Sequence, residues 1–205
     1  EQALLKLEGT AFEAQAHLSL LQIYERTRDW VQAAEVAENL EHAEHGTFRL
    51  RLAHYRCEQA AALRATGRVT EALTLLETLV QQVPQSARAW VSLADLRHSL
   101  NNNEGAWIAL KQLCVEAPSH LPLVAHNLAM WGRLTNRSDE ARMLLTTWQS
   151  QHRLSLDVTQ ALASLTDPPE AARQLYIEHM KREPSLVAAG LWLAGQTVGQ
   201  PEQDA

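Results

Sequence analysis

The sequence predicts an all-α fold of tandem antiparallel helical hairpins, and two observations support this prediction. First, an alanine returns at intervals of 39, 34, 35 and 31 residues within segments whose apolar residues follow a helical spacing. Second, polar clusters separate these segments, and prolines fall at their borders, where the missing N–H costs little. The recurring alanines are Ala33, Ala72, Ala106, Ala141 and Ala172.

A period near 34 residues is typical of the tetratricopeptide repeat (TPR), in which two antiparallel helices form each unit. We therefore expect a right-handed superhelical solenoid of antiparallel helix pairs, stabilised by the stacking of neighbouring hairpins. The expected repeats cover residues 14–47, 53–86, 87–120 and 122–155, followed by a shortened fifth unit from about residue 153.

The repeat over 87–120 shows the pattern most clearly, because its residues fall at the signature offsets of the family. These residues are Trp90, Leu93, Ala94, Ala106 and Pro118. In each hairpin the small residue should face the partner helix where the two backbones approach, and larger residues should fill the remaining space. The same offsets place Leu20, Leu21 and Tyr24 in the first helix of the first repeat.

The repeats predict one domain over residues 1–195, with about five hairpins and a final capping helix over 185–194. Residues 2–7 resemble the end of a preceding helix, so we expect the chain to be a fragment that lacks N-terminal repeats. Residues 196–205 form a polar tail. The interval of 39 residues places about five extra residues in 41–47, as a longer loop or an extra helical turn.

Composition argues against several functional classes. The formal charge is −6 and the chain has no basic stripe, which does not favour nucleic-acid binding. The sequence also contains no run of 18 apolar residues, so it does not predict a membrane-spanning helix. Cys57 and Cys114 have no Cys-x-x-Cys partner, so we expect two buried small residues and no zinc site. His42 and His45 have a spacing that could ligate a metal, but only Glu41 and Glu44 accompany them, and we predict no metal or other cofactor in this chain.

No catalytic motif is recognisable: the chain has no glycine-rich phosphate loop and no nucleophile elbow. We therefore predict a non-catalytic protein. Aromatic side chains could still line a ligand groove, but Trp30, Trp90 and Trp148 fall on core offsets. Trp107, Trp131 and Trp192 are less determined, and for Trp131 we favour the core over exposure on the inner face.

The first helices of such repeats line a concave surface on which a partner protein can bind. Counting from the repeat over 87–120, the inward positions form a mixed surface with a modest excess of positive charge. The alternative is that they are only the solvated face of each helix. The candidate partner-binding residues are Gln22, Arg26, His54, Arg64, Arg88, Asp95, His98, His126, Met130 and Arg133.

Several stretches go beyond the repeat consensus and resemble the lipopolysaccharide assembly protein B family of Gram-negative envelope regulators. They are residues 20–25 (LLQIYE), 29–38 (DWVQAAEVAE), 53–60 (AHYRCEQA), 86–88 (SAR) and 170–177 (EAARQLYI), and the resemblance runs from about residue 11 to 193. The combination of histidine, cysteine and glutamate in 53–60 is the most telling, because packing within a hairpin does not require it.

The resemblance implies a protein with an N-terminal membrane anchor, a cytoplasmic repeat array at the inner membrane and a C-terminal rubredoxin-like module that binds iron or zinc. Neither end is found in this chain. The family member would act as an adaptor that brings the lipid A pathway deacetylase (LpxC) to a membrane AAA+ protease (FtsH). Two alternatives remain open, namely a general TPR scaffold of another pathway and a sensor of a lipid or small molecule.

Overall fold

The computed structural model describes residues 10, 12–44 and 46–182, and in this part of the chain all regular secondary structure is helical. The chain divides into two compact units, Glu1–Asn102 and Asn103–Ala205. The expected capping helix over 185–194, the polar tail and the helix end at 2–7 lie outside the described residues. The expectation of a single domain therefore stays a prediction.

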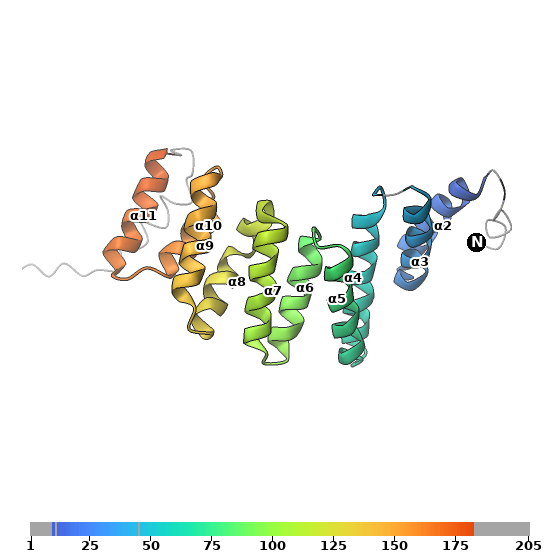
Figure 1. Ribbon diagram of the computed structural model, residues 1–205, viewed down its shortest axis with the longest axis horizontal. Coiled ribbons are helices and arrows are strands. Elements are labelled where there is room, and N and C mark those ends of the chain that lie inside the picture. The colour runs from blue at the N-terminus through green and yellow to red at the C-terminus, as the bar shows by residue number, and fades with distance from the viewer. Residues whose placement is uncertain (1–9, 11, 45, 183–205) are drawn as a thin grey trace, which may run out of the picture. The chain divides into compact units, whose positions relative to one another are not determined.

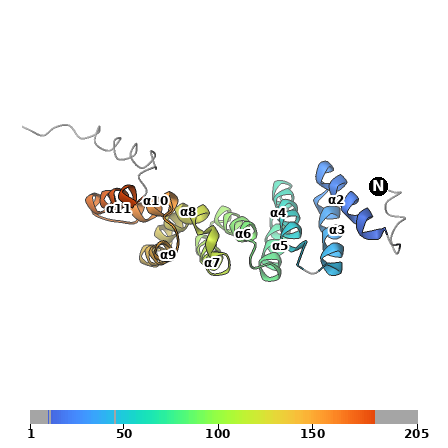
Figure 2. The same ribbon diagram turned by 90° about the horizontal axis from the view of Figure 1, so that it is seen from above.

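The first unit contains five described helices, labelled in Figure 1. Helix α4 packs against α3, α5 and α6, and in both views it lies beside α5, its partner in a hairpin (Figures 1 and 2). Helices α2 and α3 form the preceding hairpin. The bounds are α2 (Glu13–Thr27), α3 (Trp30–Ala43), α4 (Arg49–Ala65), α5 (Val69–Gln82) and α6 (Ala87–Ser99).

The turns of the first unit follow from local residue chemistry. The Asp29 carboxylate caps α3 by accepting a hydrogen bond from the Gln32 amide at 3.2 Å, and Ser86 caps α6 in the same way. Gly67, between α4 and α5, has a φ of +78°, which glycine adopts without steric penalty. The polar clusters in the sequence are therefore turns, as predicted.

The extra residues at 41–47 form the end of α3 and a short loop. The two Glu41 carboxylate oxygens accept hydrogen bonds from the amides of Gly46 and Phe48, both at 2.8 Å, and Arg49 forms an ion pair with the same group. Burial acts to raise the pKa of Glu41, but these hydrogen bonds and the Arg49 charge outweigh it, so the pKa is lowered. Glu41 thus ties the loop to the helix that precedes it.

The second unit has α8 at its centre. Helix α8 packs against α7, α9 and α10, and α10 packs against α11. Helix α10 has only 9 residues, which accounts for the shortened fifth repeat. The bounds are α7 (Asn103–Glu116), the 3-10 helix η1 (Pro118–His120), α8 (Leu121–Leu134), α9 (Ser138–Gln151), α10 (Leu156–Ser164) and α11 (Pro169–Arg182).

Helices α8 and α9 approach closely at Gly132. An added Cβ at Gly132 would lie 2.9 Å from the Cβ of Ala141 and 3.3 Å from the Trp107 ring. Ala141 is one of the recurring alanines and is fully buried, as are Ala33, Ala72 and Ala106, whereas Ala172 is half-buried. The predicted role of the small residue is confirmed for the α8–α9 hairpin.

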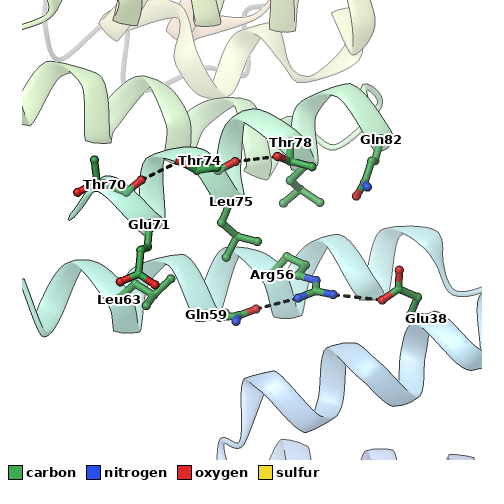
Figure 3. A pocket seen from close by; sticks show the side chains of 11 residues that line it. Glu38, Arg56, Gln59, Leu63, Thr70, Glu71, Thr74, Leu75, Thr78 and Gln82 are labelled. Carbon is green, nitrogen blue, oxygen red and sulfur yellow. Dashed lines mark hydrogen bonds and ion pairs between the residues drawn. The ribbon is translucent and has the colours of Figure 1, made fainter. Parts of the chain in front are cut away.

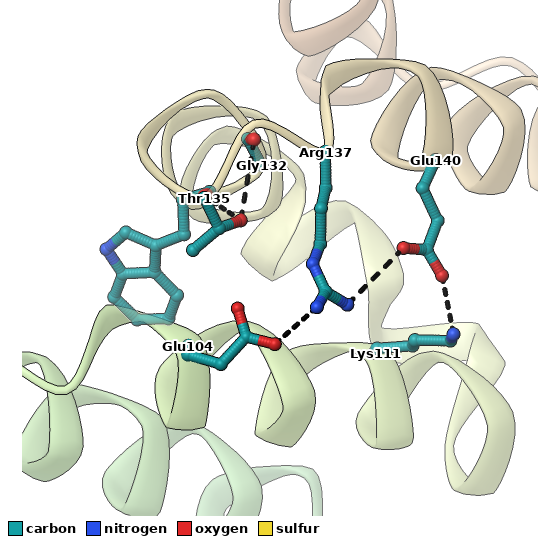
Figure 4. A network of polar contacts seen from close by, with 7 residues as sticks. Glu104, Lys111, Gly132, Thr135, Arg137 and Glu140 are labelled. Atoms are coloured by element: carbon teal, nitrogen blue, oxygen red, sulfur yellow. Dashed lines mark hydrogen bonds and ion pairs between the residues drawn. The ribbon is translucent and has the colours of Figure 1, made fainter.

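A chain of charged side chains connects α7 to the hairpin of α8 and α9 (Figure 4). Arg137, just before α9, contacts Glu104 of α7 and lies 3.8 Å from Glu140 of α9. Glu140 in turn accepts a hydrogen bond from Lys111 of α7 at 2.5 Å. These groups range from half-buried to exposed, so we expect them to fix the position of α7 more than to add stability.

Trp30 and Cys114 are less buried than the sequence predicts. Trp107 and Trp131 are fully buried, which confirms the prediction for Trp131, but Trp30 is only half-buried. Cys57 is buried as expected, whereas Cys114 is half-buried, and both are free thiols. Burial raises their pKa values to about 11 and about 12, so both thiols are protonated at neutral pH.

Trp90 and Trp148 each anchor a loop through a hydrogen bond from the indole. The Trp90 Nε1–H donates to the Pro84 carbonyl at 2.8 Å, and the Trp148 Nε1–H donates to the Pro118 carbonyl at 2.6 Å. Both rings are buried, as their core offsets predict. Trp192 lies outside the described residues.

Candidate functional site

The structure places the predicted partner-binding residues of the first unit on α2, α4 and α6. Gln22 and Arg26 are exposed on α2. The other predicted residues include two groups on α4 and α6. The first group joins His54 of α4 to Arg88 of α6. The second brings Arg64 of α4 and Asp95 of α6 to one cavity.

Arg88 crosses from α6 to α4 and binds two groups there. Its Nη1 lies 2.5 Å from Nδ1 of His54, and its Nη2 forms an ion pair with Glu58. A guanidinium can only donate, so His54 Nδ1 accepts and the imidazole carries its proton on Nε2. His54 and Arg88 thus join two hairpins, which is a structural role that the sequence did not predict.

An aromatic and ionic cluster extends the same junction toward α2 and α3. The Tyr55 ring stacks on Trp30 at 6.3 Å, and His54 meets Trp30 edge-on at 6.2 Å. The Tyr55 hydroxyl donates a hydrogen bond to Glu25, which also accepts from Arg51 at 2.9 Å. Burial and the bond to Glu25 raise the pKa of Tyr55, so the phenol remains protonated.

These contacts explain the residues of the run over 53–60. His54 and Glu58 bind Arg88, Arg56 binds Glu38 at 3.2 Å, and the buried Cys57 lies beside Ser92. Packing within one hairpin does not need this combination, but packing between consecutive hairpins uses every one of these side chains. These contacts give the run a structural role between consecutive hairpins, and Cys57 and Ala60 of the run also line the cavity between α4, α5 and α6.

A cavity of about 450 Å³ lies between α4, α5 and α6. Arg64 and Asp95 are its charged residues, and both are exposed. Small and apolar side chains supply most of the remaining surface. The full lining is Cys57, Ala60, Ala61, Arg64, Ala65, Leu76, Ser92, Asp95 and Leu96.

Asp95 has the most informative electrostatic environment in this cavity. Partial burial raises the pKa of its carboxyl, and the charges of Arg64 and His98 lower it without cancelling the effect of burial. Among the described residues, Asp95 forms no hydrogen bond or ion pair through its carboxylate. Asp95 therefore combines a raised pKa with a position at the cavity.

A second cavity, of about 570 Å³, opens between α3, α4 and α5 (Figure 3). Several of its polar side chains bind one another or their own helix. Arg56 lies between Glu38 and Gln59, each at 3.2 Å, and the hydroxyls of Thr74 and Thr78 donate to carbonyls one turn earlier in α5. Glu38, Arg56, Thr74 and Thr78 are therefore already engaged in contacts within the chain.

In the second unit, the predicted residues His126, Met130 and Arg133 are exposed on α8. Two further apolar side chains of this helix are exposed, Leu123 at 80% and Leu134 at 56%. Spacings of seven and four residues place Leu123, Met130 and Leu134 on one face of α8. Met130 is among the residues predicted from the repeat offsets, whereas Leu123 and Leu134 are not, although the helical spacing of all three is visible in the sequence.

The part of the chain that the structure describes contains no group of three or more His, Cys, Asp or Glu side chains placed to hold a metal ion. None of its helices is both long enough and apolar enough to cross a bilayer. His45 lies outside the described residues, so the pairing of His42 with His45 is not tested.

Comparison with known proteins supports the repeat fold. The tetratricopeptide repeat family matches residues 57–120. Lipopolysaccharide assembly protein B of Escherichia coli K12 is 34% identical over 86 residues, which is 42% of this chain and 22% of that protein. The chain thus matches about a fifth of the length of this curated relative.

Two solved structures have a similar fold. A TPR protein of Parabacteroides merdae superposes with a TM-score of 0.53 at 13% identity, covering 89% of this chain and 71% of that one. MamA of Desulfovibrio magneticus gives 0.51 at 14% identity, covering 84% and 96%. Together with the helical hairpins, these matches confirm the predicted all-α TPR fold. TPR hairpins indicate a protein-interaction scaffold.

Proposed function

We propose that this chain is the repeat region of a non-catalytic regulator of lipopolysaccharide synthesis. It would act as an adaptor that holds the lipid A pathway deacetylase near a membrane AAA+ protease. An adaptor needs no chemistry of its own, because binding two proteins at once raises the effective concentration of one near the other. The partners would be proteins, and the chain would work on the cytoplasmic side of the inner membrane.

The observation that carries this proposal is the similarity to lipopolysaccharide assembly protein B over 86 residues. The surface chemistry agrees with a binding role. Exposed apolar side chains on α8 lie near polar ones, and an anchor with a polar rim is the usual composition of a protein interface. Met130 and Leu134, with Arg133 between them, supply this combination.

The test is titration calorimetry of the purified 205-residue chain with the purified deacetylase and with the cytoplasmic part of the protease. We expect binding to at least one of them. Arg133→Glu should weaken that binding about three- to tenfold, because it reverses a charge beside the apolar stripe. Arg173→Glu makes the same change on the exposed side of α11 and serves as the matched control.

Circular dichroism must show that both variants remain helical. If the folded wild-type chain binds neither protein at micromolar concentration, the adaptor proposal fails. If Arg133→Glu and Arg173→Glu weaken binding equally, the binding face does not include α8.

A further inference from the structure

We propose that the cavity between α4, α5 and α6 binds a partner segment that presents one basic and one acidic side chain close together. The basic side chain would pair with Asp95 and the acidic one with Arg64. This inference rests on the proposed protein-binding function and specifies the chemistry of the segment that is bound.

The walls of the cavity suit the methylene groups of long charged side chains. Ala60, Ala61 and Ala65 contribute small surfaces from α4, and Leu76 and Leu96 contribute apolar surface from α5 and α6. Lysine, arginine and glutamate bury their aliphatic stems against such walls while their charged ends reach polar partners. A volume of about 450 Å³ lies within the range of pockets that bind ligands.

The charges at this cavity differ from those around it because, among the described residues, no hydrogen bond or ion pair within 4.0 Å holds either side chain, although the charges of Arg64 and His98 act on Asp95. Arg88 is bound by His54 and Glu58, and Arg97 binds Glu77 at 2.7 Å. Arg64 and Asp95 both line the cavity, yet no ion pair within 4.0 Å joins them. The cavity therefore presents one positive and one negative group, and the complementary ligand carries both signs.

The Asp95 carboxyl has a raised pKa, so partial burial disfavours its charged form. Its pKa is raised because burial removes water from the charged form more than Arg64 and His98 compensate for it. A cationic group from a partner would supply the missing interaction. Ion pairing also discriminates between partners, because a wrong charge leaves the group unpaired.

The test uses alanine-based peptides that carry one lysine and one glutamate separated by one to four positions. Binding is followed by NMR of the chain with labelled alanine methyl groups, because Ala61 and Ala65 line the cavity and report directly on it. Matched peptides carry norleucine in place of lysine, or glutamine in place of glutamate. We expect the methyl signals of Ala61 and Ala65 to shift with at least one doubly charged spacing and much less with either matched peptide.

Asp95→Asn and Arg64→Gln should each weaken that binding at least fivefold. Asp157→Asn on α10 and Arg173→Gln on α11 remove the same charges from exposed positions of the other unit and should leave it unchanged. The inference is overturned if no spacing shifts the Ala61 and Ala65 signals at millimolar peptide. It is equally overturned if the Asp95→Asn chain binds the peptides as well as the wild type does.

The failure of this inference can be told apart from failure of the adaptor proposal. If the deacetylase or the protease binds the wild type and Asp95→Asn equally, the cavity is not the contact but the adaptor proposal stands. If the peptides bind in the cavity and neither protein binds the chain, the cavity recognises another partner and the adaptor proposal fails.

Discussion

Gly132 is the residue at which the packing of α8 on α9 leaves no room for a methyl group. Alanine favours a helix over glycine by about 1 kcal/mol, but the new Cβ would lie 2.9 Å from the Ala141 Cβ, which is fixed to the backbone. We expect Gly132→Ala to lower the free energy of unfolding by roughly 1–2 kcal/mol, as overpacking of a core does. Denaturation with urea would measure the change.

The double variant Gly132→Ala with Ala141→Gly supplies the control for this prediction. It moves the methyl group from one helix to the other, so it should recover most of the loss. If Gly132→Ala is as stable as the wild type, α8 and α9 can separate at this point without cost.

The raised pKa of Asp95 predicts that its contribution to stability changes with pH. Because its pKa is raised in the folded chain, the stability linked to this carboxyl is greatest below the unfolded pKa and is lost as the pH rises through the folded value. Asp95→Asn should therefore be more stable than the wild type at pH 7, and the difference should shrink at pH 3. Thermal melts across this range would test the prediction, and an Asp95→Asn chain less stable at pH 7 would contradict it.

At the scale of elements, the loop between α3 and α4 depends on one carboxylate. The pKa of Glu41 is lowered on folding, so its contribution to stability is present above the unfolded pKa and disappears as the pH falls through the folded value. We expect Glu41→Gln to lower the melting temperature at pH 7 and to have little effect in strong acid. Glu44→Gln removes the same charge from an exposed position in this loop and should have a smaller effect.

Helix α4 should be the most protected element of the first unit. It packs against α3, α5 and α6, and Tyr55 and Arg51 tie it to Glu25 of α2. Within the described residues, helix α2 packs mainly against α3. Hydrogen exchange should therefore be slower in the middle of α4 than in the middle of α2, since opening α4 breaks contacts with several neighbours. Equal exchange in the two helices would argue against this view.

The helices were predictable because the pattern behind them is local. The buried alanines, the turn at Gly67 and the cap at Ser86 all follow from residue types at short spacing. The contacts between hairpins were not predictable in the same way. His54 and Arg88 are 34 residues apart, and their contact depends on the distance between two helices that no short-range signal specifies.

At the scale of the whole molecule, the sequence identified the fold class and the helices on which the candidate residues lie, but not the site itself. The offset counting selected Arg64 and Asp95 among ten candidates without indicating that these two line one cavity. It also selected Arg88, whose guanidinium is already bound by His54 and Glu58. Which exposed residue has a partner within the chain depends on side-chain geometry, and composition and spacing do not contain this information.

The junctions between hairpins also restrict the order in which hairpins can follow one another. Glu25 binds Tyr55 and Arg51 at one junction, whereas Arg88 binds His54 and Glu58 at the next, so the donors and acceptors differ from joint to joint. A hairpin duplicated or moved to another place in the array would meet a neighbour with the wrong charges. A copied repeat would therefore keep these pairs only if the residues at the new joint changed with it.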